Sequence, residues 1–520
     1  MLFNSYPFIF LLLPISLFVF FAIGSRGHHR VAIAWLIGVS LFFYAWWNPA
    51  YLGLLLASIL FNYALGVSLS GEGHSSEKKW LLIFGIAANL SLLGYYKYAN
   101  FFVDNINFIF GDILGVETII LPLGISFITF QTIAYLVDAY KGETKEYNFL
   151  HFCLFVTFFP QLIAGPIVHH REMMPQFARN DLYQLSVRRH AVGFTIFTIG
   201  LFKKVVLADG VAAYATPAFH AADSGIALTF FEAWAGALAY TLQLYFDFSG
   251  YSDMAIGLAR MFGIRLPLNF NSPYKSTNII DFWRRWHITL SRFMRDYIYI
   301  PLGGNRKGPT RRHANLMIAM LLGGLWHGAG WNFVVWGGLH GFFLIVNHVW
   351  RSLFGGRAAA SRMGKAFGWT LTFVAVIAAW VPFRAETITG TKSIWLGMIG
   401  ANGVSLEPEA LRILGRFGEW LQGVGVTFDG VFAHVAGAKP EMAGAWLLVL
   451  TIFVLFLPNT QQLMRNYHPA FETYKGEIQR LRWRWMEWRP TVIWANLTML
   501  LFVFDVLSLT KVSEFLYFQF

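Results

Sequence analysis

Long apolar stretches recur along the sequence and predict membrane-spanning helices. A helix that crosses the hydrocarbon core of a bilayer needs roughly 20 predominantly apolar residues. We expect such helices at about 6–22, 31–46, 51–69, 80–96, 119–137, 190–207, 228–246, 315–329, 332–350, 366–381, 443–457 and 492–507. The pattern predicts an all-α polytopic membrane protein with about 11–12 transmembrane helices.

Two segments carry residues that interrupt helices. Residues 159–166 contain two prolines and a glycine, so we expect 149–168 to form a re-entrant hairpin buried in the protein. The stretch 228–263 is too long for one crossing, and residues 247–250 include an aspartate, a serine and a glycine. We therefore expect a second broken helix at residues 247–250.

The distribution of charge predicts the orientation of the chain in the membrane. Segment 264–313 holds ten basic residues against two acidic ones, which is typical of a cytoplasmic loop. The three loops after it fit positions inside, outside and inside the cytoplasm in turn. They hold four basic and no acidic residues in 351–366, five basic against six acidic in 384–442, and six basic against three acidic in 459–491. The first basic residues follow the first apolar stretch, so we expect a periplasmic N-terminus.

Composition excludes an ordinary soluble enzyme, because 56% of the residues are hydrophobic and only 13% are charged. The net charge of +12 is explained by orientation in the membrane, and we expect no nucleic-acid partner. The single cysteine, Cys153, excludes an intrachain disulfide and a thiolate zinc cluster, and we expect no bound metal. The sequence has no Walker loop, no G-x-S-x-G elbow and no H-E-x-x-H motif.

Polar residues within apolar segments are costly, so they are the first candidates for function. His327 lies among small glycines and tryptophans in 323–332, where an imidazole could act as a general base. The alternative is a histidine that hydrogen-bonds a neighbouring helix, with glycines that only permit close packing. His340 is a weaker candidate, because on one continuous helix it would face away from His327 unless a turn at 328–332 intervenes.

A second candidate region is 281–292. On a continuous helix Trp283, His287 and Ser291 would share one face, and Arg284, Arg285 and Arg292 could hold phosphates from the cytoplasmic side. The alternative is an amphipathic helix on the membrane surface, with its arginines on lipid headgroups.

Further polar residues in apolar segments have a weaker claim. Asp247 and Asp253 could relay protons or contact a substrate, but we favour Ser252 or Asp253 as the N-cap of a following helix. Gln131, Tyr135 and Asp138 could line the same cavity.

Residues 283–287, followed forty residues later by 324–328, resemble the motifs of the membrane-bound O-acyltransferases, with 159–166 and 247–253 as supporting segments. The similarity is greatest to the branch of this family that O-acetylates exported bacterial polysaccharides such as alginate. It implies a helical bundle with a funnel from each side that meets at a central histidine. It also implies that His327 is catalytic and that His287 is the second polar residue of the catalytic site.

The resemblance implies an acyl donor from the cytoplasm, with acetyl-CoA as the expected donor and no permanently bound cofactor. Trp283, Arg284, Arg285 and Arg292 would contact this donor. An exported polysaccharide would be the acceptor, and a periplasmic acetyltransferase of the SGNH-hydrolase type is an expected partner. The chain itself would lie in the bacterial inner membrane. The related teichoic-acid enzymes make D-alanyl from a carrier protein the alternative acyl group.

The sequence is interpreted as one integral-membrane domain over 1–520, with a motif-bearing core at 119–383, an outer loop at 384–442 and C-terminal helices at 443–507. The first hypothesis for function is a polysaccharide O-acetyltransferase or an acetyl-relay subunit. The alternatives are a proton-coupled transporter or flippase of a polysaccharide-export system, and a channel or scaffold without catalysis. The outer loop could dock a partner or simply cover the bundle.

Overall fold

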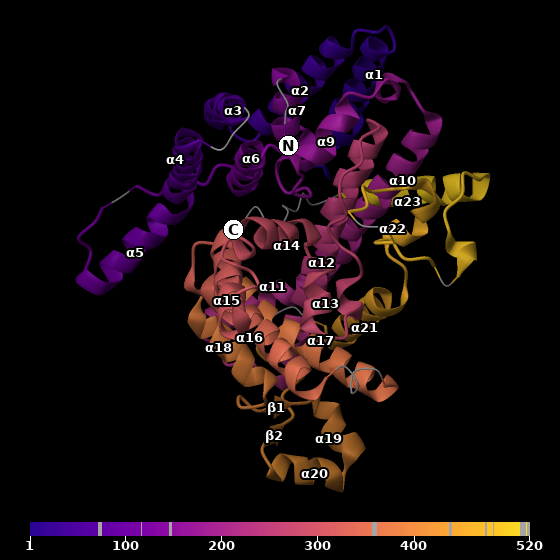
Figure 1. Cartoon of the computed structure of the whole chain (residues 1–520). Helices are drawn as coiled ribbons and strands as arrows, with labels where there is room; N and C mark the ends of the chain where they lie inside the picture. The colour runs from indigo at the N-terminus through magenta and orange to yellow at the C-terminus, as the bar shows by residue number, and fades with distance from the viewer. Residues whose placement is uncertain are drawn as a thin grey trace.

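The computed structural model describes residues 1–70, 75–115, 117–144, 148–355, 361–435, 439–473, 476–481, 483–509 and 516. It is almost entirely helical, as Figure 1 shows. The N-terminal helices are η1 Phe8–Leu12, α1 Leu13–Gly24, α2 His29–Ala45, α3 Tyr51–Leu69, α4 Ser76–Leu93, η2 Gly94–Tyr98, α5 Ala99–Phe110, α6 Ile125–Tyr140, α7 Phe149–Thr157, α8 Phe159–Leu162 and α9 His170–Phe177. The central ones are α10 Val187–Phe202, η4 Lys203–Ala208, α11 Asp209–Asp223, α12 Phe230–Met261, α13 Ile279–Trp283, α14 Ile288–Met294, η6 Arg295–Tyr299, α15 Gly308–His327, α16 Trp331–Phe354 and α17 Arg362–Arg384. The remaining elements are α18 Ile388–Met398, β1 Val404–Ser405, α19 Pro408–Leu414, α20 Arg416–Gly423, β2 Val426–Thr427, α21 Pro440–Phe456, α22 Thr460–Leu463 and α23 Val492–Leu507.

Helix length and composition confirm a multi-pass, all-α membrane protein. Within the described residues, five continuous helices are long and apolar enough to cross a membrane: Tyr51–Leu69, Ser76–Phe110, Val187–Asp223, Trp331–Phe354 and Arg362–Arg384. Four shorter apolar helices accompany them, at Phe8–Gly24, His29–Ala45, Pro440–Phe456 and Val492–Leu507. In Figure 1 the N-terminal helices and the group α15 to α18 lie on either side of the long helix α12.

The predicted interruption near Phe159 is confirmed. Helix α7 has nine residues, which at 1.5 Å per residue makes it about 14 Å long, less than half of the hydrocarbon thickness. The backbone turns at Phe158. Ser40 then accepts a hydrogen bond from the Phe159 N–H at 3.2 Å. The freed backbone group therefore finds its partner inside the protein, as membrane depth requires.

The expected break at 247–250 is wrong, because α12 runs without interruption from Phe230 to Met261. Its polar residues are paired by neighbouring helices instead. Lys204 binds Asp247 at 2.7 Å and Lys203 binds Asp253 at 2.6 Å, both from the π-helical segment η4. Asp253 therefore is not an N-cap, and neither is Ser252. A buried carboxylate that has a cation beside it can stay within a continuous helix.

Glycines bring α10 and α12 into direct backbone contact. A Cβ on Gly193 would lie 2.6 Å from the carbonyl oxygen of Gly257, and one on Gly200 would lie 2.7 Å from that of Gly250. On each helix the two glycines are seven residues apart, which is about two turns. The same close contact therefore occurs twice along the crossing. This crossing holds η4 against the middle of α12, where the two lysines meet the two aspartates.

Two other expectations about helix bounds are wrong. The crossing expected at 119–137 starts later, because residues 117–122 are not helical and α6 begins at Ile125 after Gly124 in the left-handed region, with φ of 71°. Segment 281–292 is not one helix, because the chain breaks between α13 and α14 at His287.

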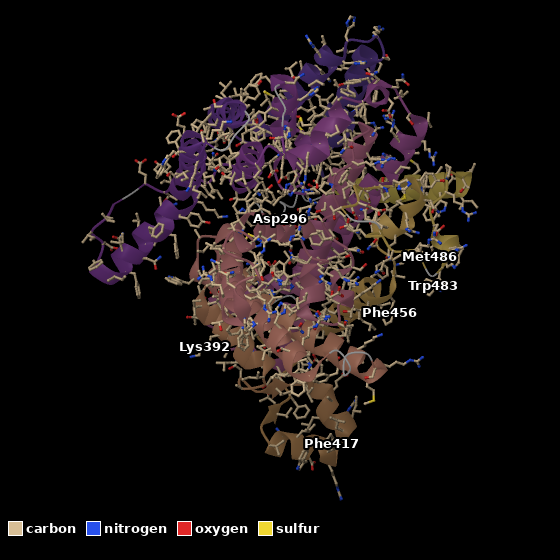
Figure 2. The ribbon with its side chains drawn as sticks, in the orientation of Figure 1. Asp296, Lys392, Phe417, Phe456, Trp483 and Met486 are labelled. Carbon is tan, nitrogen blue, oxygen red and sulfur yellow. The ribbon has the colours of Figure 1, made fainter. Side chains whose placement is uncertain are left out.

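The outer loop forms a small projection from the bundle. Strand β1 pairs in parallel with β2, Val404 opposite Val426, and α19 and α20 lie beyond them (Figure 1). Phe417 marks the far end of this projection in Figure 2. Residues 436–438 of the predicted loop lie outside the described residues.

Candidate active site

His327 is the last residue of α15 and lies deep in the bundle, 3% exposed. The helix ends there because residues 328–330 form a turn before α16 begins at Trp331. A Cβ on Gly328 would overlap the ring of Phe333, so only glycine fits at this point of the turn. His327 and His340 therefore lie on two different helices, which is the case that the sequence left open.

Aromatic side chains surround the His327 imidazole. The ring centroids of Trp326, Trp336 and Phe383 lie 4.9, 4.9 and 5.1 Å from it. Trp380 stacks on Trp336 at 5.9 Å behind this layer. On this side the imidazole therefore packs against apolar rings, a setting in which hydrogen bonds and charges act strongly.

His287 lies close to His327, with 6.4 Å between the two imidazole centroids. It is completely buried and sits in the left-handed region, with φ of 41°, an uncommon and strained conformation for a residue with a side chain. Its Nδ1 lies 3.0 Å from Oδ1 of Asn269. Because an amide oxygen only accepts, Nδ1 carries the hydrogen, and Nε2 holds the lone pair in the neutral ring.

Asn269 is the residue that holds this strained turn in place. Its Oδ1 also accepts from the Thr289 hydroxyl at 3.0 Å, and its backbone carbonyl accepts from the Ile288 N–H at 3.0 Å. One side chain thus fixes both the orientation of His287 and the start of α14. No sequence pattern singles out Asn269, because its position beside His287 depends on how the chain folds back.

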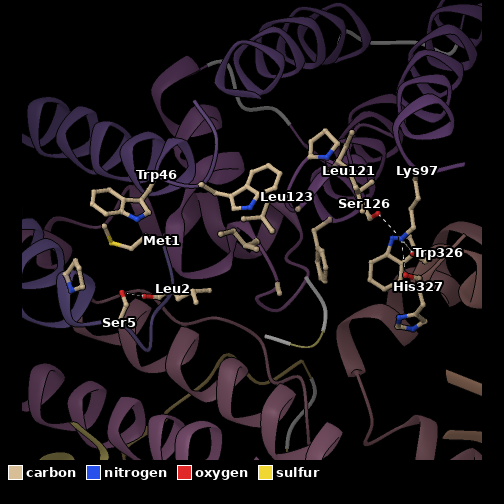
Figure 3. Close-up of a pocket in the computed structure, with 18 residues that line it drawn as sticks. Met1, Leu2, Ser5, Trp46, Lys97, Leu121, Leu123, Ser126, Trp326 and His327 are labelled. Carbon is tan, nitrogen blue, oxygen red and sulfur yellow. Dashed lines mark hydrogen bonds between the residues drawn. The ribbon is translucent and has the colours of Figure 1, made fainter. Parts of the chain in front are cut away.

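Lys97 and Tyr98 hold the end of α15. Lys97 Nζ donates to the carbonyl oxygens of Trp326 and His327, the latter at 3.0 Å (Figure 3). Tyr98 donates to the carbonyl oxygen of Leu325 at 2.7 Å. The last carbonyls of a helix have no partner within it and carry partial negative charge, so an ammonium group stabilises them. The π-helical turn η2 carries both side chains.

Sequence reasoning missed Lys97, although the signal was present. A buried lysine at the end of an apolar segment is an intramembrane charge, and such charges are candidates for function. The predicted helix 80–96 ends one residue before Lys97, and no role is predicted for Lys97 from the sequence.

The Lys97 cavity, of about 490 Å³, reaches His327 from one side. Its other lining residues come mainly from the chain before α3 and from the segment before and at the start of α6. Trp46 lies near Met1 (Figure 3). Ser126 lies next to Lys97 in this cavity, 3.4 Å from its Nζ.

The Arg284 cavity, of about 910 Å³, reaches the aromatic layer from another side. Trp336 and Trp283 lie at its inner end, and its lining includes four arginines: Arg171, Arg284, Arg292 and Arg295. The two cavities share no lining residue. Between them stand His327, which lines the first, and Trp336, which lines the second, with ring centroids 4.9 Å apart.

The structure brings together three of the four residues that the sequence assigned to the acyl donor. Trp283, Arg284 and Arg292 line the Arg284 cavity, and Arg292 also binds Glu172 at 2.6 Å. Arg285 is not among the lining residues, because it turns to Asp281, 3.0 Å away. Arg171 and Arg295 line the cavity in addition and were missed.

Near the Arg284 cavity the loop before α23 contributes a buried carboxyl group. Glu477 accepts hydrogen bonds from the Thr473 backbone and hydroxyl, and Thr473 lines the cavity. Burial raises the pKa of Glu477 above its ordinary value, against the opposing effect of those hydrogen bonds and of Arg292.

The other polar candidates lie apart from His327. His340 accepts from the Trp283 indole at 3.3 Å, so it orients a residue of the Arg284 cavity. Gln131 donates to the Phe155 carbonyl, and Asp138 accepts from the Tyr297 hydroxyl at 2.7 Å. Among the described residues, no group of three or more His, Cys, Asp and Glu side chains is placed to hold a metal ion.

The arrangement places an imidazole, a group that can accept a proton, where two separately entered cavities approach each other. A second histidine is fixed beside it, and arginines line one of the two entrances. Two reactants could therefore meet at His327 without sharing an entrance.

Comparison with known proteins assigns a family to this arrangement. Residues 132–383 match the model of the membrane-bound O-acyltransferase family. The chain is 44% identical over 485 residues to a peptidoglycan O-acetyltransferase of Helicobacter pylori, covering 88% of this chain and 89% of that protein. It is 37% identical over 530 residues to a probable alginate O-acetylase of Pseudomonas putida, covering both chains fully. A teichoic acid D-alanyltransferase of Streptococcus thermophilus is 29% identical over 248 residues, 45% of this chain and 59% of that protein.

Proposed function

The chain belongs to the membrane-bound O-acyltransferase family, and we propose that it takes an acetyl group from cytoplasmic acetyl-CoA for the O-acetylation of an exported polysaccharide. The observation that carries the proposal is the position of His327 between the two cavities. Relatives named for alginate and for peptidoglycan favour acetyl as the acyl group and a polysaccharide as its destination.

His327 acts as the general base in this proposal. It removes the proton from an acceptor hydroxyl, and the oxygen attacks the thioester carbonyl carbon. The carbon–sulfur bond then breaks, the new ester keeps the acetyl group, and the proton leaves with the coenzyme A thiol. Such base catalysis contributes roughly 10²- to 10⁴-fold to a rate.

The residues around His327 supply orientation and charge. His287, fixed by Asn269 and with its ring centroid 6.4 Å from that of His327, polarises the reacting group. Lys97 keeps the last turn of α15, and with it His327, in place. Arg171, Arg284, Arg292 and Arg295 hold the phosphates of the donor, for which the planar guanidinium group is well suited.

The proposal also assigns sides of the membrane. The arginine-rich entrance belongs to the most basic loop, so it faces the cytoplasm of a bacterial inner membrane, and the N-terminus lies in the periplasm. A periplasmic acetyltransferase of the SGNH type is the partner that would pass the acetyl group on if this chain does not contact the polymer itself.

The test is the content of ester-linked acetyl in the exported polysaccharide. A deletion strain is complemented with wild type or with His327→Ala, and membrane levels are matched by immunoblot. We expect His327→Ala to lower acetyl content at least about 100-fold while polymer export stays unchanged. Retained acetyl would remove His327 as the base, and lost export of an unmodified polymer would favour a transporter.

Purified protein separates chemistry from transport. Labelled acetyl-CoA should release free coenzyme A in a reaction that depends on His327, whereas a transporter would leave the thioester intact. An acetyl–protein adduct that persists after quenching would indicate a covalent relay, and its absence at all quench times would indicate direct transfer.

A further inference from the structure

A third cavity, the Trp331 groove, has no task in the proposed reaction. It has a volume of about 520 Å³ and lies between the start of α16, the end of α17 and helix α5. Phe383 lines it, and the ring of Phe383 lies 5.1 Å from that of His327. The groove is therefore next to the catalytic histidine but is entered separately from the other two cavities.

The groove presents an exposed aromatic ring that is held in one orientation. Trp331 is 58% exposed, yet its indole N–H donates to Oδ1 of Asn105 at 2.8 Å. Asn105 is itself fixed, because its Nδ2 donates to the Phe101 carbonyl at 2.6 Å. The Phe101 ring lies 5.9 Å from the indole. A ring that is exposed but rigid costs little entropy when a ligand stacks on it.

Two buried polar atoms of the lining residues lack partners. Asn332 is 7% exposed and donates from Nδ2 to the Ala385 carbonyl at 2.6 Å. No group in the described part of the chain hydrogen-bonds to its Oδ1, and the same holds for Nε of Arg384. Buried polar groups in native proteins are nearly always satisfied, so these two point to a ligand that both donates and accepts.

Carboxylates complete the rim. Asp104 and Glu386 are exposed lining residues, and Glu386 lies 4.0 Å from the Arg384 guanidinium. A sugar hydroxyl donates to a carboxylate or an amide oxygen and accepts from a guanidinium. The apolar C–H face of a pyranose ring fits against an aromatic ring. The set of groups in this groove therefore matches a carbohydrate more closely than the mostly apolar Lys97 cavity does.

We propose that the Trp331 groove binds a sugar unit of the polysaccharide acceptor, with the pyranose on Trp331 and its hydroxyls on Asn332 and Arg384. The inference rests on the proposed function, since it concerns the acceptor of the same site. It means that this chain contacts the polymer directly, close to the turn that carries His327.

The test measures sugar binding without catalysis. The full chain in lipid nanodiscs is titrated with a mannuronate hexasaccharide and with a tetrasaccharide of alternating N-acetylglucosamine and N-acetylmuramic acid, by calorimetry. Trp331→Ala should raise the Kd of the bound sugar at least about tenfold. The matched control is Trp420→Ala, because Trp420 is also 58% exposed and lies away from the groove, on α20. Its Kd should equal that of wild type.

Two further results decide the proposal. Asp104→Asn alters only an exposed rim residue, so it should fold normally and weaken binding about threefold, which keeps the test valid if Trp331→Ala misfolds. The titration contains no acyl donor, so a failure of the acyltransfer reaction would not be confused with a failure of this groove. If neither sugar binds to wild type, or if Trp331→Ala and Trp420→Ala bind equally, the groove is not a sugar site.

Discussion

At the scale of single residues, the site depends on side chains that hold His327 and His287 rather than on the histidines alone. Lys97 binds the carbonyl oxygens at the end of α15, and Asn269 fixes the His287 ring. Lys97 hydrogen-bonds directly to His327, and Asn269 hydrogen-bonds directly to His287. Displacements of about 1 Å in a catalytic group can cost 100-fold in rate, so under the proposed function such supports would carry part of the catalytic effect.

Replacement of Lys97 tests this view. Lys97→Met keeps the length of the side chain but removes its donors, so we expect kcat to fall at least about tenfold while KM for the donor changes little. Lys97→Arg, which retains donors, should recover part of kcat. Tyr98→Phe removes one hydrogen bond, to Leu325, and is the milder control.

A structural role alone would predict a different result for Lys97. Loss of the ammonium group leaves carbonyl groups unpaired, which costs about 1–3 kcal/mol of stability. If Lys97→Met lowers the amount of folded protein but leaves kcat per folded molecule unchanged, Lys97 is needed for folding and does not position His327.

The sequence could identify His327 and His287 as candidates. It could not identify Lys97 and Asn269, the residues that hold them in position. His327 stood out because a titratable residue among glycines and tryptophans is unusual in an apolar segment. Asn269 lies eighteen residues from His287 and Lys97 lies 230 residues from His327, and these contacts arise only from the fold. The Trp331 groove was not predicted, because its lining comes from α5, α16 and α17.

At the scale of elements, close helix packing explains where the sequence pattern failed. A polar run in an apolar stretch suggested a break in α12, but Lys203 and Lys204 pair with Asp253 and Asp247 across the contact with η4. That contact depends on the glycines at which α10 and α12 touch. Periodicity along one helix carries no information about a partner charge on another.

Substitution at this crossing should lower stability. Gly200→Ala would place a Cβ 2.7 Å from the Gly250 carbonyl oxygen, so the helices must separate, at a cost of about 1–3 kcal/mol. The readout is the thermal unfolding midpoint in detergent. Gly38→Ala is the matched control, because its Cβ would meet nothing within 4 Å on α2, and it should leave the midpoint unchanged or raise it slightly.

An equal effect of the two glycine substitutions would contradict this account. In that case the cost would come from helix propensity or from the membrane environment, and the Gly200–Gly250 contact would not define the crossing.

At the scale of the whole molecule, the two cavities at His327 should open to opposite sides of the membrane. Cys153 is the single cysteine and is buried, so a Cys153→Ser background allows single reporters. Trp47→Cys reports on the Lys97 cavity and Arg171→Cys on the Arg284 cavity. An impermeant maleimide should label the first in spheroplasts and the second in inside-out vesicles.

Labelling of both positions from the same side would overturn the assignment of sides. It would leave the chemistry of His327 intact but would require donor and acceptor to arrive from one compartment. The charge pattern of the loops predicts labelling from opposite sides. The orientation in the membrane is the part of the topology that could be predicted from the sequence alone.

The layer of rings between the cavities has one more consequence. In the described residues the two cavities share no lining residue, and the rings of His327 and Trp336 stand between them. A bacterium stores energy as a proton gradient across the same membrane. Under the proposed function, this separation would let a two-carbon unit pass outward without joining the two aqueous compartments, so polymer modification need not discharge the cell.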